Sequence, residues 1–509
     1  MANQDTSKIS AEKLYKETTQ DQRAYLDRAR SASLLTIPQL YPPEGSDEHT
    51  DYPTPYQSLG AKGVNNLANK IVLSLFPPNT AFFKAGLSPA DTQAIGKGEG
   101  EIKKAMQLLE TTVVNDMENS ELRPKLVHLA KLLIVGGSAV IHVPQDGSPE
   151  IFRLDSFGVR RDKKGNVLRL AIKQQLAYSS LSKKVKDSLP QEKITESVVN
   201  DKKLLDMYTA IIKEEDGKFS VFQEILGTKI PGTEGTFKED KLPYLFIPFV
   251  DTGENYGRSY VEDFIGDLES YEGLRQAILE GSAESARILY LLRPNSTLSI
   301  KKLQNAKSGD VLMGNRDDVS TMQADKRFDL SVTQQEANTL RQELSVLFLL
   351  DSAVQRDAER VTATEIRQVG QELEVALGGI YSTLASTAQK PLVKLYMERL
   401  VKQGKLSRVL SGALDIDIKT GAAALGRGAD FNTLSTFVQT LGQIAQNPTM
   451  ANLINIEELT QRLAYSLDIN TASLVVTEKE RQQREEVQQQ QAVEQKVAPE
   501  VAKNQLQQE

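Results

Sequence analysis

One segment constrains the fold more than any other, because a polar loop with two arginines runs directly into a long, well-capped helix. The segment covers residues 351–392 and reads DSAVQRDAERVTATEIRQVGQELEVALGGIYSTLASTAQKPL. Thr362 and Glu365 have the spacing of a capping box, in which the hydroxyl accepts from the N3 amide and the carboxylate accepts from the cap amide. We therefore expect a rigid helix that begins at Thr362 and carries the preceding loop.

Apolar residues then recur at helical spacing and predict one buried face for this helix. They are Ile366, Val369, Leu373, Leu377, Ile380, Leu384 and Ala388. Gly378 and Gly379 interrupt the pattern, and each glycine costs roughly 1 kcal/mol relative to alanine inside a helix. Because such a pair weakens a helix locally, the sequence predicts a kink at this point.

Composition narrows the class of protein. The 509 residues are enough for about two to four domains, and 39% of them are hydrophobic, which allows sizeable cores. The chain has no cysteine, which excludes a disulfide framework, thiolate metal sites and cysteine nucleophiles. The N-terminal residues lack a signal-peptide pattern and no apolar run reaches the length of a membrane span. We expect no membrane association, and residence or assembly in a cytosol.

The charge balance bears on whether the chain binds nucleic acid tightly. Its formal net charge is -7, from 61 basic and 68 acidic residues. A protein that grips DNA gains affinity by neutralising phosphates, which this balance disfavours. A surface along which a polyanion slides needs few persistent phosphate contacts, and this balance would suit it. It equally suits an ordinary soluble protein.

The hydrophobic period changes along the first half of the chain. Helices are expected at residues 8–36, 56–76, 99–118 and 121–135. Short strand-like runs follow, separated by turns such as QDGS, KKGN and EDGK, at residues 139–143, 151–154, 167–173, 204–212, 219–226 and 244–250. The predicted fold class is therefore mixed α+β and mainly helical, with a β-rich insert in a helical domain.

The second half is again mainly helical. Helical patterns at 257–291 and 332–350 flank a module at 292–330 with short strand-like pieces, which suggests an antiparallel helix pair with the module at its tip. After the long helix, a strand is expected at 414–418. Helices are expected near 429–446 and 455–467, and the glutamine-rich tail from residue 478 is either a helical extension or disordered.

No motif predicts an enzyme, a cofactor or a metal site. The chain lacks a P-loop, and its three histidines form no recognisable triad or zinc motif. Residues 251–262 partly mimic a calcium-binding loop, but Gly253 and Tyr256 occupy positions that require a ligand and a sharp-turn glycine. A turn leading into a helix is the better interpretation. Within it, Arg258 either anchors the turn to a carboxylate or is simply exposed.

The capped-helix segment resembles the portal (head-to-tail connector) proteins of short-tailed, podovirus-type bacteriophages. These proteins carry an arginine-bearing loop, a run of the form E-R-V/M-T-A-x-E-I/V-R and then a long helix with a small-residue interruption. Residues 54–78 (TPYQSLGAKGVNNLANKIVLSLFPP) resemble another block of that family. Residues 255–268 (NYGRSYVEDFIGDL) and 421–430 (GAAALGRGAD) resemble two more, and all four blocks occur in the family's order.

This resemblance implies a portal-type fold with a β-rich wing, antiparallel stem helices, a small α/β clip, a long kinked helix and a helical crown. Its parts would be a wing at 1–256, a first stem helix at 257–291, a clip at 292–330, a second stem helix at 331–350, a tunnel loop at 351–361, a long kinked wing helix at 362–402, a crown at 403–477 and a glutamine-rich tail at 478–509.

The resemblance also implies a function. Copies of the chain would form a homododecameric ring around double-stranded DNA at one capsid vertex of the virion, after assembly in the host cytoplasm. The ring would serve DNA packaging and ejection, and its partners would be the terminase, tail adaptor proteins, and the major capsid and scaffold proteins. Two other classes remain as alternatives: a nuclease or hydrolase acting on phage DNA, for which no acidic or histidine cluster is evident, and a monomeric phage scaffolding or adaptor protein.

By the same resemblance, Gln355, Arg356, Glu359 and Arg360 would line the narrowest part of the channel and make weak, transient contacts with phosphates. Alternatively, either arginine pairs with an acidic residue of its own or a neighbouring loop. In the clip, Lys301, Lys302 and Lys307 would face a tail adaptor or DNA. The alternative is a solvated basic turn.

Overall fold

The computed structural model describes residues 9–46, 50–78, 82–87, 99–286, 289–296, 298–313, 315–322, 327–350, 363–406 and 414–418. The chain divides into two compact units, one formed by residues 1–80 and 113–406 and the other by residues 81–112 and 407–509. Helices and antiparallel sheets both contribute to the described part, so the fold is mixed α and β.

The first unit begins with two helices, α1 (Ala11–Thr18) and α2 (Arg23–Leu34), where the sequence predicts one helix over 8–36. That prediction is wrong because the turn between them is held from outside. The Gln22 side chain is buried and donates to the carbonyl oxygens of Leu154 and Phe157, so the chain leaves the helical path there. The hydroxyl of Thr19 donates back to the carbonyl oxygen of Tyr15.

Three further helices follow the order expected from the sequence. They are α3 (Leu59–Leu75), α5 (Glu99–Asn119) and α6 (Leu122–Gly136). Helices α3 and α6 pack together in the first unit, and Leu67, Ile71 and Leu133 are buried there. Gly137 ends α6 with φ 76, a left-handed conformation that glycine adopts without steric cost.

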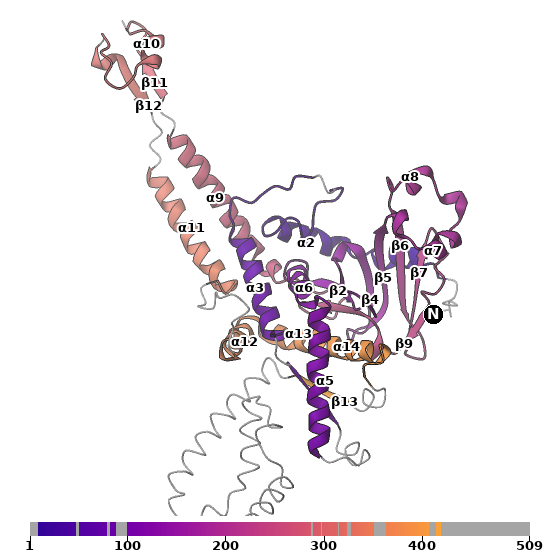
Figure 1. Cartoon of the computed structure of the whole chain (residues 1–509). Helices are drawn as coiled ribbons and strands as arrows, with labels where there is room; N and C mark the ends of the chain where they lie inside the picture. Colours follow the sequence, from indigo (N-terminus) through magenta and orange to yellow (C-terminus); the bar gives the residue numbers. More distant parts are fainter. Residues whose placement is uncertain are drawn as a thin grey trace, which may run out of the picture. The chain divides into compact units, whose positions relative to one another are not determined.

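Two antiparallel sheets form the β-rich insert (Figure 1). The smaller sheet has the order β10 (Tyr244–Pro248), β2 (Ser138–His142), β3 (Glu150–Phe152). The larger runs β4 (Phe157–Arg161), β5 (Val167–Leu176), β6 (Leu205–Lys213), β7 (Phe219–Ile225), β8 (Thr228–Lys229), with β9 (Gly235–Phe237) also pairing with β7. The short helices α7 (Lys183–Ser188) and α8 (Glu196–Val199) lie between β5 and β6 in the chain. Helix α1 packs on the larger sheet, where Leu14, Ala171 and Phe222 share a core.

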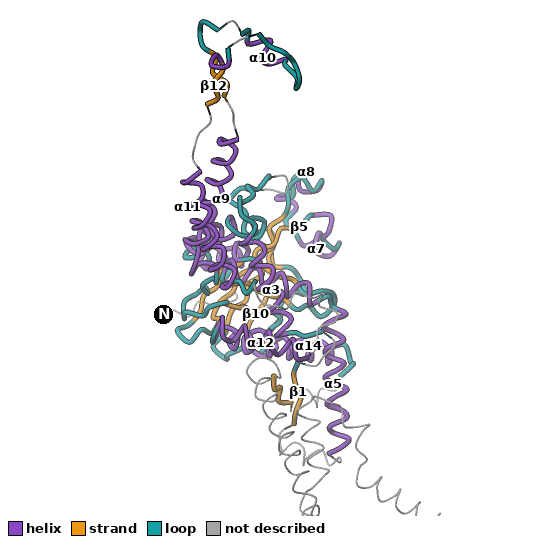
Figure 2. The backbone as a smooth tube through the Cα atoms, turned by 90° about the vertical axis from the view of Figure 1, so that its left-hand side faces the viewer, coloured by secondary structure: helices purple, strands orange, loops and turns teal. Residues whose placement is uncertain are grey.

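Helices α9 (Ile265–Ala286) and α11 (Arg327–Leu347) lie side by side (Figures 1 and 2). The chain between them contains β11 (Leu289–Leu292), α10 (Ile300–Asn305) and β12 (Val319–Met322). Strands β11 and β12 pair antiparallel, with Leu289 opposite Met322. The helix expected to reach residue 291 ends at Ala286, since its last predicted turn belongs to β11.

The region predicted as one long kinked helix is divided into several elements. They are α12 (Ala363–Leu377), α13 (Gly379–Leu384), a π-helical turn (Ala385–Gln389) and α14 (Lys390–Lys402). Between α12 and α13, Gly378 has φ 56 and ψ -136, so the helix is interrupted at the glycine pair. The predicted buried face is confirmed for Val369, Leu373 and Leu377.

In the second unit, β1 (Phe83–Leu87) pairs antiparallel with β13 (Leu414–Ile418), so segments more than 300 residues apart form one ribbon. The strand expected at 414–418 is confirmed, but its partner is not apparent from the sequence. The helices expected near 429–446 and 455–467, and the glutamine-rich tail, lie outside the described residues. In the described part of the chain, no helix is both long and apolar enough to span a membrane.

Candidate functional site

The best-defined candidate site surrounds the C-terminal end of α11, where the chain enters the predicted arginine-bearing loop. The loop residues Gln355, Arg356, Glu359 and Arg360, and the predicted cap Thr362, lie outside the described residues. Glu365 is in α12, but its side chain also lies outside them. The structure does describe the residues that hold the two ends of this segment. We call Asn66, Lys70, Tyr260, Phe348 and Leu349 the α11 socket.

Backbone geometry ends α11 sharply. Leu349 has φ 54, in the left-handed region that costs an ordinary residue about 1–2 kcal/mol. The Leu350 amide donates to the carbonyl oxygen of Ser345 (2.8 Å), and the Leu349 amide donates to that of Val346 (3.0 Å). This is the Schellman pattern of helix ends, usually built on glycine. Because Leu349 occupies the position where glycine is usual, contacts with the surrounding side chains must offset the cost of its left-handed conformation.

Side chains from distant elements satisfy the last carbonyl groups of α11, which have no partner within the helix. The Tyr260 hydroxyl donates to the carbonyl oxygen of Leu347 (2.9 Å). Nδ2 of Asn66 donates to the carbonyl oxygens of Phe348 (3.0 Å) and Leu349 (2.9 Å). The helix end is therefore fixed to α3 and to the turn before α9.

Lys70 joins both sides of the predicted loop. Its Nζ donates to the carbonyl oxygen of Leu349 (3.0 Å) and to Oε2 of Glu372 in α12 (3.4 Å). The Lys70 side chain is only 6% exposed. A cation at a helix C-terminus is electrostatically favoured. One lysine of α3 thus contacts the element before residues 351–361 and the element after them.

Phe348 fills the space beneath the socket. It is fully buried and meets the rings of Tyr260 and Phe264 edge to face, with centroids 6.5 Å and 5.2 Å away. A Cβ added to Gly63 would lie 2.3 Å from Cγ of Phe348. Only glycine at that position of α3 allows the ring to pack so closely.

The Tyr-Gly-Arg-Ser block at residues 256–259 precedes α9 and forms hydrogen bonds with residues of both sheets and of α1. The Tyr256 hydroxyl accepts from the Val159 amide (3.3 Å) and donates to the carbonyl oxygen of Thr18 (3.2 Å). Burial raises the pKa of Tyr256 well above its usual range, so its hydroxyl stays protonated. The Gly257 amide donates to Oγ of Ser138 (2.8 Å). This block is structural in the described chain.

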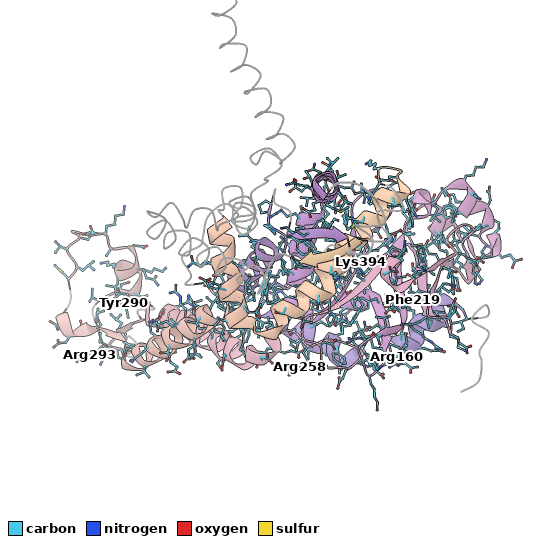
Figure 3. All side chains as sticks on the ribbon, turned by 90° about the horizontal axis from the view of Figure 1, so that it is seen from below. Arg160, Phe219, Arg258, Tyr290, Arg293 and Lys394 are labelled. Carbon is cyan, nitrogen blue, oxygen red and sulfur yellow. The ribbon has the colours of Figure 1, made fainter. Side chains whose placement is uncertain are left out.

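Arg258 satisfies both alternatives left open by the sequence. Its Nη2 lies 2.8 Å from Asp263 and its Nε lies 3.4 Å from Glu262, while half of its side chain remains exposed (Figure 3). Nearby, both carboxylate oxygens of Asp251 accept from Arg161 (3.0 and 2.6 Å), and this hydrogen bonding holds the pKa of Asp251 below its usual value. Among the described residues, no three His, Cys, Asp or Glu side chains are grouped to hold a metal.

The predicted clip lysines are exposed. Lys301 and Lys302 lie on α10, and Lys307 follows it, with its amide donating to the Asp310 carboxylate (2.7 Å). The same module carries an apolar feature that the sequence analysis missed, since Val311 is 96% exposed and Met313 is 92% exposed. Tyr290, from β11, is also exposed there (Figure 3). The signal for it is the apolar run Val-Leu-Met inside an otherwise polar stretch.

Sequence reasoning did not assign roles to Asn66, Lys70, Tyr260 or Glu372. One signal was available for Lys70. It falls among Leu67, Ile71 and Ser74 on the buried side of α3, where a lysine is rare unless it has partners.

The chain is similar to known proteins over most of its length. The family model for the bacteriophage head to tail connecting protein matches residues 8–475. A portal protein of Enterobacteria phage T3 is 34% identical over 484 residues, covering 93% of this chain and 89% of the relative. A portal protein of Escherichia phage T7 is 33% identical over 487 residues with the same coverage. A portal protein of Pseudomonas phage phiKMV is 28% identical, covering 93% of each chain.

Proposed function

Because the chain belongs to the bacteriophage head to tail connecting protein family, we propose that its copies form a twelve-fold ring around an axial channel for double-stranded DNA. The function itself is that of a portal protein, which serves packaging of the phage genome. One observation carries this conclusion: the similarity to portal proteins of phages T3 and T7 extends over 93% of the chain.

The parts of the portal fold are assigned as part of this proposal. Residues 1–256 form the wing, α9 and α11 the stem, and 292–330 the clip. The long kinked wing helix runs over 362–402, and the crown over 403–477. The side-by-side packing of α9 and α11, with a small β-ribbon module between them in the chain, supports the stem and clip.

Residues 351–361 act as the tunnel loop, with Gln355, Arg356, Glu359 and Arg360 facing the DNA. The α11 socket supports this assignment, because a loop that contacts moving DNA needs fixed ends. Mixed charges in the loop keep its phosphate contacts weak, so that DNA can slide. The interruption at Gly378 and Gly379 lets the helix after the loop bend as the loop moves.

The ring sits at one capsid vertex of the virion and is assembled in the host cytoplasm. It docks the ATP-driven terminase during packaging, then tail adaptor proteins, and it contacts the major capsid and scaffold proteins. Its role is mechanical, with no catalytic step. In the clip, Lys301, Lys302 and Lys307 would contact the adaptor, and the exposed Val311 and Met313 extend that surface. The alternative of a monomeric scaffolding or adaptor protein has no support from the relatives, which are named portal proteins.

Charge reversal tests the tunnel loop. Arg356→Glu combined with Arg360→Glu should leave the ring intact and reduce the DNA retained in filled particles. Lys163→Glu combined with Lys164→Glu, in the exposed turn between β4 and β5, changes the net charge equally and is the matched control. Loss of the ring in the loop variant would instead give these arginines a structural role.

A further inference from the structure

A polar pocket opens between the start of α3, α9 and α11. Its volume is about 520 Å³, and its lining includes Lys62 from α3, Tyr271 and Arg275 from α9, and Asn338 and Arg341 from α11. Three of these side chains are cationic. The pocket therefore presents a concentrated positive charge on a chain whose formal net charge is -7.

Within the described part of the chain, Lys62, Arg275 and Arg341 form no ion pair with a carboxylate. The nearby carboxylate of Glu272 accepts from two backbone amides rather than from any of these cations, and its single negative charge leaves the three cations in excess. Its Oε1 accepts from the Tyr56 amide (2.7 Å) and its Oε2 accepts from the Gln57 amide (3.2 Å). A pocket with three such cations is suited to a negatively charged group supplied from outside the subunit.

Another face of α11 carries the complementary charge. Glu336 and Glu343 are exposed, lie seven residues apart and so share one side of the helix. The exposed Val332 and Val346 lie on the same side. Since each residue turns the helix by about 100°, Arg341 lies roughly 140–160° from these glutamates around the helix. Neither glutamate has a partner among the described residues.

One subunit cannot pair these two faces with each other, because they lie on opposite sides of the same helix. Two different, complementary patches on one chain are what a head-to-tail contact requires, and repeated head-to-tail contacts close into a ring. We propose that Glu336 and Glu343 of one copy dock at the Lys62, Arg275 and Arg341 pocket of the next. This deepens the proposed function, on which it rests, by naming the contact between subunits.

The pocket lies beside the start of the tunnel loop. Leu350, the last residue before the tunnel loop, also lines it. A neighbouring α11 docked there would contact the root of that loop. The intersubunit contact would then help to set the position of every loop around the ring.

A charge exchange tests the contact. Arg275→Glu with Arg341→Glu should shift assembly at least about tenfold to higher protein concentration, and so should Glu336→Arg with Glu343→Arg. All four changes together should recover much of the assembly, because the pairs are restored with opposite signs. Lys163→Glu with Lys164→Glu and Glu192→Arg with Glu215→Arg, all at exposed positions, make the same changes in net charge and are the controls. Native mass spectrometry reads the oligomer directly.

Cross-linking gives a second readout, which the absence of native cysteine makes specific. A short bis-maleimide should join Glu343→Cys of one subunit to Arg275→Cys of the next. The double variant should therefore give a ladder of cross-linked oligomers well beyond the dimer on a denaturing gel. Neither single variant should be cross-linked. Rings that form without the ladder and survive both reversals would overturn this contact while leaving the portal function standing. A wild-type chain that never forms rings would overturn the function itself. Rings that persist but retain less DNA would assign the pocket to phosphate.

Discussion

Nζ of Lys70 lies 3.0 Å from the carbonyl oxygen of Leu349 and 3.4 Å from the Glu372 carboxylate. These two partners flank the segment that contains the predicted tunnel loop. A single buried side chain on α3 therefore sets both anchor points of that segment. Any force on the loop would be transmitted to α3 and the packed helices beneath it, rather than to the loop's own short ends.

Lys70→Met should lower the free energy of unfolding by about 2 kcal/mol, because it removes a buried ion pair and one of the donors to the Leu349 carbonyl oxygen, which keeps its hydrogen bond from Asn66. Glu372→Gln should have a smaller effect, since Lys70 would still donate to Leu349. Denaturant unfolding measures both, with Lys163→Met as the exposed control. Equal losses in all three variants would show that Lys70 is not an anchor.

Asn66 and Asn69 form a matched pair on one helix. Asn66→Ala removes hydrogen bonds to two carbonyl oxygens, of which that of Leu349 keeps its bond from Lys70, and should destabilise by about 1–3 kcal/mol. Asn69 is exposed, so Asn69→Ala should stay within about 0.5 kcal/mol of the wild type. Hydrogen exchange at the Leu349 and Leu350 amides should rise only in the first variant. Similar exchange in both would contradict the socket.

The two glycines after α12 should respond oppositely to alanine. Gly378→Ala places a side chain at φ 56 and ψ -136 and should cost about 1–3 kcal/mol. Gly379 is helical, with nothing within 4 Å of an added Cβ, so Gly379→Ala should stabilise by up to about 1 kcal/mol. Thermal unfolding separates them. If both stabilised the chain, α12 and α13 would form a continuous helix.

The Asp251 carboxylate provides a pH test. Arg161 holds its pKa below the usual value, so the pair adds stability that is complete above about pH 4 and is lost as pH falls through the folded-state pKa. Asp251→Asn should therefore be less stable than the wild type at pH 7, and the difference should shrink near pH 3. Melting temperatures at the two pH values check this. If the difference in melting temperature between Asp251→Asn and the wild type were the same at both pH values, the ionised carboxylate would not be what stabilises the pair.

Local patterns predicted most of the helices, because burial of one face fixes their extent. The helix expected at 121–135 is α6 (Leu122–Gly136), and the one expected at 99–118 is α5 (Glu99–Asn119). The break between α1 and α2 was missed because Gln22 bonds to carbonyls more than 130 residues away. The pairing of β1 with β13 was missed for the same reason.

The socket was beyond sequence reasoning because its parts come from separate elements. Asn66 and Lys70 are on α3, Tyr260 precedes α9, and Leu349 follows α11. The family-like block at residues 54–78 was visible, but its asparagine and lysine gain a role only when the end of α11 lies beside them. The interruption of the long helix could be expected from Gly378 and Gly379, whereas the π-helical turn that follows has no comparable signal.

The mass of the purified assembly, measured by light scattering and followed by electron microscopy of the same fraction, tests the central claim most directly. The measurement should be made at several salt concentrations, with and without coexpressed scaffold and capsid proteins. The account predicts a large annular particle with a central hole. A chain that stays monomeric under all of these conditions would contradict it.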